Sequence, residues 1–164
     1  MTATSHANTL DETPWRNADM LHAGHQSPGL DGHRDAPPGG HHYTVILTSG
    51  AEDGGKRATL AASMACTALS MDLRTHLFLV GDGSYWAYEG HADGIQVAGF
   101  PALEELLDSF VLLGGSLAIC STCDQVLCHA SGGSDRPLRR RAGAQIQGMA
   151  ALMEPLMRGQ AVTF

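Results

Sequence analysis

Three short apolar runs, each separated from the next by a segment long enough for a helix, constrain the fold more than any other feature of the sequence. The runs cover residues 43–48, 73–80 and 116–120 and are rich in Val, Ile, Leu and Phe. Nearly continuous apolar runs of this length are typical of strands that are buried on both faces of a sheet. Strands that alternate with helices form parallel sheets. The sequence therefore predicts an α/β fold, a three-layer sandwich around a mostly parallel sheet of about five strands.

The intervening segments carry the signals of helices. Residues 56–71 have apolar side chains at three- and four-residue steps, which predicts a helix that packs this face on the sheet: Leu60, Met64, Thr67, Ala68 and Met71. A second helix is expected to begin near Pro101, because the fixed φ of proline suits a first turn, and to end at Gly114 and Gly115. A third helix is expected after Cys120 and should end at Gly132 and Gly133. A short segment at 144–147, a helix at 148–158 and a strand at 160–164 are expected to complete the fold.

Residues 1–42 differ in composition from the rest of the chain. They contain six of the nine histidines, several Gly and Pro residues and few apolar residues at useful spacings. This composition predicts a disordered, His-rich N-terminal extension, followed by one domain at 43–164. The histidines could chelate nickel, copper or zinc, but a solvated tail without that role is the favoured interpretation.

Charge and hydropathy exclude two classes of partner. The 164 residues carry a formal net charge of −7 and only 10 Lys and Arg residues, which provides no broad basic surface for direct nucleic-acid binding. The one basic cluster is Arg136 with Arg139, Arg140 and Arg141. No stretch approaches the roughly 18–20 apolar residues that a membrane span requires, and the N-terminus has no apolar signal core. We therefore expect a cytoplasmic protein without a membrane anchor.

The cysteines point to thiol chemistry. Three of the four, Cys120, Cys123 and Cys128, lie within nine positions, whereas Cys66 stands apart and is expected to be a small buried hydrophobic residue. A thiol at the junction of a strand and a helix gains thiolate character, because it meets unpaired N–H groups of the first turn. Cys120 is therefore the expected nucleophile. Cys123, about 60° further round that helix, would be near enough for disulfide or persulfide exchange.

Polar and glycine residues follow the first two predicted strands. Ser49 and Gly50 come after one strand, and Asp82 and Gly83 come after the next. The carboxyl ends of parallel strands meet at one edge of a sheet, where ligands bind in open α/β folds. We expect these four residues to form a substrate-binding rim beside Cys120.

A metal site is one alternative. Cys120, Cys123, Cys128 and His129 offer four ligands in ten residues, but such sites usually take ligands from two separated clusters, and the second is missing. On a continuous helix Cys128 would also lie about 140° from Cys123. We therefore predict no metal and no other cofactor.

Residues 50–57 nearly match the phosphate-loop pattern GxxxxGK[ST], and they lie between a strand and a helix. Arg57 replaces the required hydroxyl, and Glu52 and Asp53 add negative charge, so an ordinary turn is favoured. A thioredoxin-like arrangement is disfavoured, because the CxxC follows the third strand and faces no suitably placed proline. Trp86 and its neighbouring tyrosines could line a pocket or an oligomer contact, or pack in the core.

Four segments together resemble the DsrE/DsrF-like family over about residues 43–164. They are TSGAEDGGKRATLAASMACTAL, FLVGDG, the CSTC after the third strand, and the closing AQIQGMAALMEPLMRGQAVTF. The resemblance implies a five-stranded α/β sandwich that commonly oligomerises. It also implies that Cys120 carries a persulfide between partner proteins. Such partners would be sulfur donors and acceptors, for example a TusA-like carrier or a rhodanese.

The leading hypothesis is therefore a cytoplasmic sulfur carrier or sulfurtransferase, acting as a homo-oligomer through Cys120 with help from Cys123. The alternatives are a non-catalytic oligomeric binding or redox-sensing module and a metal-binding protein that uses the CxxC. Transfer to tRNA thiolation, to sulfur oxidation or to cofactor assembly is left open by the sequence.

Overall fold

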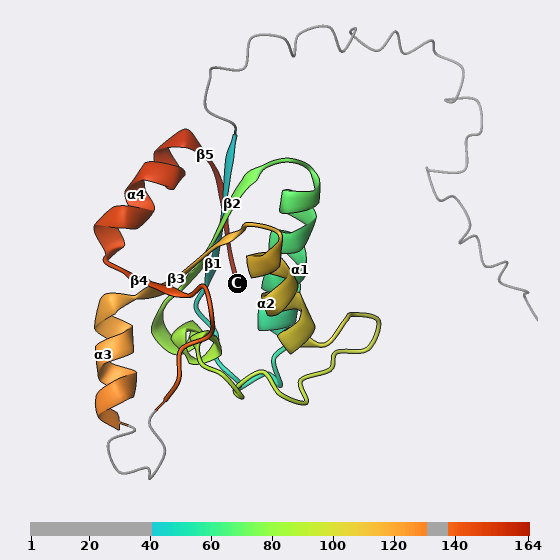
Figure 1. Ribbon diagram of the computed structural model, residues 1–164, viewed down its shortest axis with the longest axis vertical. Helices are drawn as coiled ribbons and strands as arrows, with labels where there is room; N and C mark the ends of the chain where they lie inside the picture. The colour runs from blue at the N-terminus through green and yellow to red at the C-terminus, as the bar shows by residue number, and fades with distance from the viewer. Residues whose placement is uncertain (1–40, 131–137) are drawn as a thin grey trace, which may run out of the picture. The chain divides into compact units, whose positions relative to one another are not determined.

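The computed structural model describes residues 41–130 and 138–164, which form a five-stranded sheet with helices on both faces (Figure 1). The strand order is β4-β3-β2-β1-β5, and the four pairings within it are parallel. The strands are β1 (His42–Leu47), β2 (Arg74–Leu79), β3 (Ser116–Cys120), β4 (Gln145–Gln147) and β5 (Gly159–Thr163). The predicted α/β sandwich is confirmed, with a sheet that is entirely parallel across the described strands.

In the described part of the chain, four α-helices and one 3-10 helix connect the strands. They are α1 (Lys56–Ser70), the 3-10 helix η3 (Gly81–Ala87), α2 (Leu103–Leu112), α3 (Ser121–Ala130) and α4 (Met149–Arg158). None of the described helices is long and apolar enough to cross a bilayer.

The boundaries differ from the predicted ones by one to a few residues. Strand β1 begins at His42, one residue inside the segment that the sequence assigned to the extension. Residues 1–40 and 131–137 lie outside the described part of the chain. The predicted disorder of the extension and the helix end at Gly132 and Gly133 therefore stay predictions.

The two faces of the sheet are covered unequally. On the face covered by α1 and α2, which we call the α1–α2 face, the buried core includes Val45, Leu77 and Ile119 from three strands, with Trp86 and Phe110. The opposite, α3–α4 face has a much smaller buried cluster: Phe78, Ala118, Cys120 and Leu152. Alternation along β3 thus places Leu117 and Ile119 in the main core and Cys120 on the thinner side.

The predicted packing face of α1 is wrong for the large side chains. Leu60 and Met64 are each 42% exposed and Met71 is 67% exposed, whereas the buried residues of the helix are mainly alanines. Both sets recur at helical spacing, so periodicity did not decide between them. An alanine ridge lets α1 lie close to the sheet and to α2, and that close approach excludes the longer side chains. The alanines concerned are Ala58, Ala61, Ala62, Ala65 and Ala68.

We predict that Ala65→Leu destabilises the protein by about 1–3 kcal/mol, because the site is fully buried and offers no room for three more carbons. The same new side chain at the adjacent exposed position, in Met64→Leu, is expected to change stability by less than about 0.5 kcal/mol. Urea unfolding midpoints of the two variants measure the difference. Equal midpoints would show that the alanine face is not tightly packed.

Candidate thiol site

Cys120 is the last residue of β3, and α3 begins at the next residue. The apolar run before it is buried between the two helical layers, which fixes the end of the strand. The Cys120 side chain is only 4% exposed and packs in the small cluster on the α3–α4 face with Phe78, Ala118 and Leu152. The predicted position at a strand–helix junction is confirmed, but the thiol is covered.

Hydrogen-bond donors surround the sulfur of Cys120. Burial by itself raises the pKa of this thiol, but the backbone N–H groups of Cys123 and Thr122 and the side chains of both residues donate to it, and they hold the pKa below its usual value. These donors belong to the first turn of α3, where backbone N–H groups have no partner within the helix. The start of α3 therefore supplies donors that favour the thiolate form of Cys120 over the thiol.

Cys123 joins α3 to the end of β2. Its Sγ accepts a hydrogen bond from the backbone N–H of Gly81, at an N···S distance of 3.2 Å. The side chain is half-buried and also packs against the Cys120 cluster. The two cysteines of the CxxC thus lie together where β2 and β3 end, as predicted.

The predicted rim residues also come together, at the carboxyl ends of β1 and β2. A Cβ at Gly50 would lie 3.2 Å from the Cβ of Asp82, and the N–H of Gly83 donates to the carbonyl of Thr48 over 3.0 Å. A Cβ at Gly83 would collide with the carbonyl of Leu47, so the close approach of these turns requires glycine there.

Ser49, which the sequence analysis predicted to bind substrate, instead contacts a core residue through its backbone. Its side chain is 4% exposed, and its carbonyl accepts a hydrogen bond from the indole N–H of Trp86 over 2.9 Å. Trp86 is fully buried and Tyr88 is 1% exposed, so these aromatic residues pack in the core. Only Asp82 of the four rim residues projects an exposed functional group. A substrate-binding role for Ser49, Gly50, Asp82 and Gly83 stays a prediction.

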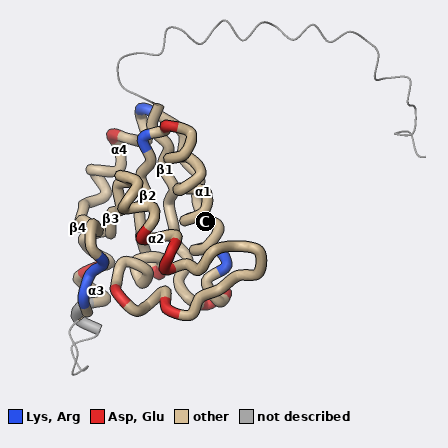
Figure 2. Tube along the Cα trace, turned by 45° about the vertical axis from the view of Figure 1, so that its right-hand side comes forward, with Lys and Arg blue, Asp and Glu red and all other residues tan. Residues whose placement is uncertain are grey.

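A buried polar contact that the sequence analysis missed fixes α3 against η3. The hydroxyl of Tyr88 donates to Oδ1 of Asp124 over 2.7 Å, and both side chains are buried. Arg140 Nε lies 3.9 Å from the same carboxylate oxygen. Asp124 follows Cys123 directly, so this contact holds the first turn of α3 in place. Figure 2 shows the basic segment at residues 139–141 beside α3.

The next residue of that basic segment is anchored on α2. The guanidinium of Arg141 is 4% exposed and donates two hydrogen bonds of 2.7 Å to Glu104 and one of 2.8 Å to Asp108. The hydrogen bonds from Arg141 hold the pKa of Glu104 below its ordinary value, although partial burial opposes this. The sequence shows the basic cluster but does not indicate that Arg141 pairs with Glu104, because the two residues are 37 positions apart in the chain.

The phosphate-loop alternative is not supported by the geometry at the start of α1. The carboxylate of Asp53 accepts hydrogen bonds from the backbone N–H groups of Lys56 and Arg57, each over 3.0 Å. A phosphate would have to displace this carboxylate to reach those donors. The favoured interpretation, a turn with an acidic residue at the helix start, fits these contacts.

The metal-site alternative depends on Cys120, Cys123, Cys128 and His129 lying together. Among the side chains that the structure describes, which do not include those of Cys128 and His129, no group of three or more potential ligands among His, Cys, Asp and Glu occurs. Helix α3 continues without a break to Ala130, so Cys128 stays on the helix at about 140° from Cys123.

Cys66 lies apart from this site, between α1 and α2. Its Sγ is 3.4 Å from the carbonyl oxygen of Leu106, to which the thiol donates. Burial raises the pKa of the Cys66 thiol. The expected packing role is consistent with both observations.

The fold and the site define a class: an all-parallel α/β sandwich with a polarised thiol where β3 meets α3. The sequence model of the DsrE/DsrF-like family matches residues 41–164, and the chain belongs to this family. The crystal structure of the ychN protein from E. coli is similar in fold, with a TM-score of 0.55 and 20% sequence identity over 75% of this chain and 99% of that chain. A comparison with curated proteins gives no match.

We predict that Cys120 titrates below the pKa of an unfolded thiol, because the donors of the α3 start favour the thiolate. Cys123→Ala should raise the Cys120 pKa only in part, since the backbone donors remain. Ultraviolet thiolate absorbance of the folded and urea-unfolded chain measures these values in variants that retain Cys120 with Cys123, Cys120 alone or Cys66 alone. Cys66 is the matched control and should titrate above its unfolded value. A Cys120 pKa equal to the unfolded value would contradict the predicted polarisation.

Proposed function

We propose that this protein is a cytoplasmic sulfur carrier or sulfurtransferase in which Cys120 accepts and passes on sulfane sulfur. The observation that carries the proposal is the position of Cys120 at the junction of β3 and α3, where Cys123 packs against it and the first turn of α3 supplies donors that favour the thiolate. Membership of the DsrE/DsrF-like family, whose members generally act in sulfur relay with partner proteins, supports the same chemistry. The partners would be a donor persulfide protein, such as a rhodanese, and an acceptor such as a TusA-like carrier.

The first half-reaction moves one sulfur atom to Cys120. Its thiolate attacks the outer sulfur of a donor persulfide, a new S–S bond forms, and the donor S–S bond breaks as the electron pair leaves on the donor thiolate. In the second half-reaction an acceptor thiolate attacks the outer sulfur of the Cys120 persulfide. The Cys120 thiolate then leaves, and the donors that lower its pKa also stabilise it as a leaving group.

Cys123 provides a second way to release the sulfur from the Cys120 persulfide. Its thiolate could attack Sγ of Cys120, which forms the Cys120–Cys123 disulfide and releases hydrosulfide. A dithiol reductant would then be needed to restore both thiols. The short sequence separation and the shared cluster of the two side chains make this exchange possible.

Access is the main requirement of this function, because Cys120 is 4% exposed. The small cluster over it includes Leu152, with Leu156 packed against the same cluster, and both come from α4. Helix α4 or the first turn of α3 must therefore move before sulfur can be exchanged, and local opening of this thinly packed face would admit a small donor such as polysulfide as well as a partner thiol.

We predict that the reduced protein gains the mass of one or more sulfur atoms when it is incubated with inorganic polysulfide, and that dithiothreitol removes them. Cys120→Ser should abolish the gain, whereas Cys66→Ser should retain it. Intact-protein mass spectrometry measures both variants. If Cys120→Ser gains as much sulfur as the unaltered protein, the carrier role is wrong. If no sulfur is accepted but a Cys120–Cys123 disulfide forms on oxidation, the redox-sensing alternative is favoured.

We also infer a homo-oligomer, on the basis of an apolar stripe on α4. Met149, Met153 and Met157 are 58%, 54% and 82% exposed at four-residue spacing, and Ile146 of the neighbouring edge strand is 43% exposed. Exposed apolar patches of this kind mark contacts with partners.

Met153→Glu is expected to shift the assembly toward the monomer, because it would place a charge inside the contact. Sedimentation analysis of the unaltered and altered chains gives their masses. The same change at Met71, which is 67% exposed after the end of α1, should leave the mass unchanged. Dissociation by Met71→Glu but not by Met153→Glu would place the contact elsewhere.

A further inference from the structure

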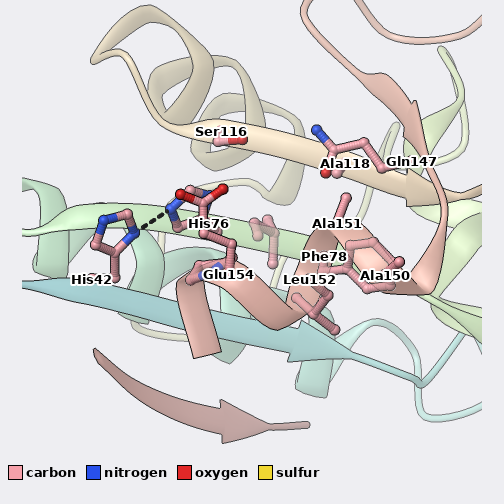
Figure 3. Close-up of a pocket in the computed structure, with 12 residues that line it drawn as sticks. His42, His76, Phe78, Ser116, Ala118, Gln147, Ala150, Ala151, Leu152 and Glu154 are labelled. Carbon is pink, nitrogen blue, oxygen red and sulfur yellow. Dashed lines mark hydrogen bonds between the residues drawn. The ribbon is translucent and has the colours of Figure 1, made fainter. Parts of the chain in front are cut away.

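A pocket of about 330 Å³ lies on the α3–α4 face, between the strands and α4 (Figure 3). Its strand side includes Ser116 and Ala118, which precede Cys120 on β3, while Cys120 itself does not line it. Phe78, Ala118 and Leu152 belong both to the pocket wall and to the cluster that covers the thiol. The pocket is therefore a neighbour of the thiol site and is not part of it.

Two imidazoles are hydrogen-bonded at one end of this pocket. Nδ1 of His42, on β1, lies 2.9 Å from Nε2 of His76, on β2, and the ring planes differ by only 4° (Figure 3). A neutral imidazole carries one proton, so two neutral rings that share one hydrogen bond keep one further N–H and one bare nitrogen. The pair thus offers a hydrogen-bond acceptor whichever ring donates the shared proton.

The hydrogen-bonding capacity of the pair is not fully used. His42 is 9% exposed, and its Nε2 has no partner among the described residues. Burial lowers the pKa of His76, and the nearby His42 lowers it further, whereas the charge of Glu154 raises it. The net direction keeps His76 neutral near pH 7, so the bare nitrogen is available at that pH.

Glu154 of α4 is the one charged side chain that lines the pocket. Figure 3 shows its carboxylate beside His76. Arg158 lies 3.3 Å from Glu154 on the exposed surface of α4, and Arg74 pairs with His42 across the strands, but neither arginine lines the pocket. Strands β3 and β4 contribute the uncharged Ser116 and Gln147. The lining therefore contains one carboxylate and no Lys or Arg, while Ser116 and Gln147 can each donate or accept a hydrogen bond.

We propose that this pocket binds a small primary ammonium ion, with the carboxylate of Glu154 and the bare nitrogen of the His42–His76 pair accepting its N–H groups. An ammonium group donates three hydrogen bonds and accepts none, so the carboxylate of Glu154 and the bare nitrogen of the pair can both accept from it. It would share the Glu154 carboxylate with Arg158, which approaches Oε1 from the exposed surface of α4. The apolar body would lie against Phe78, Leu152 and Pro155, which line the same space.

An organic anion would need the opposite protonation state. The buried pair would have to take up a proton, against the desolvation that lowers the His76 pKa, and the anion would face the carboxylate of Glu154. The two ligand classes therefore give opposite pH dependences. Ammonium binding should weaken as His76 becomes protonated at acidic pH, below its ordinary titration range, whereas anion binding should strengthen.

The test uses the full-length protein and three probes with the same aromatic body: benzylammonium, benzyl alcohol and benzoate. Titration calorimetry is expected to give saturable binding of benzylammonium, tighter than that of the other two by about tenfold or more. Its affinity should fall from about pH 7 to about pH 5. Tighter binding of benzoate, with affinity rising toward low pH, would overturn the proposal, and so would the absence of saturable binding of benzylammonium.

Glu154→Gln is the matched variant, because it keeps the side-chain shape and removes the charge at an exposed helix position, where substitutions usually change stability little. It should weaken benzylammonium by about tenfold. Glu105→Gln removes the same charge from the exposed surface of α2, on the other side of the sheet, and should leave the affinity unchanged. Equal weakening by both variants would mean general attraction to an acidic protein and would overturn the site.

Discussion

The hydrogen bonds from the first turn of α3 to the sulfur of Cys120 depend on where β3 ends, and the end of β3 is set by the parallel pairing of β3 with β2 and β4. In this sheet the carboxyl ends of β1, β2 and β3 reach one edge. A helix that begins directly after a strand directs its free N–H groups toward that edge. The thiol site therefore results from the backbone, and the side chains of Tyr88 and Asp124 add the contact that keeps α3 in position.

One face of the sheet holds most of the hydrophobic core, and the other holds the thiol and the pocket. The α1–α2 face buries the larger cluster, including the largest aromatic side chains, so most of the apolar surface removed from water lies there. The α3–α4 face buries few large side chains and contains both the thiol and the pocket. A thinly packed helix such as α4 can shift at a smaller free-energy cost than α1, whose alanines are in close contact with the sheet.

Sequence reasoning located the strands, the CxxC junction and the family, because each depends on local patterns. It did not identify the buried face of α1, since two sets of residues share the helical period and only the distance to α2 decides between them. The Tyr88–Asp124 contact joins residues 36 positions apart, and the His42–His76 pair joins residues 34 positions apart. Both depend on strand register and on the placement of α3, which no short pattern in the sequence encodes. His42 was assigned to the extension because histidines are frequent there, although its alternation with Thr44 and Ile46 fits a strand.

Leu152 connects the two sites on the α3–α4 face. It packs against the cluster that contains Cys120, and it also lines the pocket with the histidine pair. A displacement of α4 that uncovers the thiol must therefore change the pocket, because one side chain forms part of both walls. Coupling free energies are reciprocal. If exposure of the thiol changes the affinity of the pocket for a ligand, the bound ligand must change the equilibrium for thiol exposure by the same factor. The accessibility of Cys120 therefore depends on the position of the whole of α4, which covers the thiol and also lines the pocket.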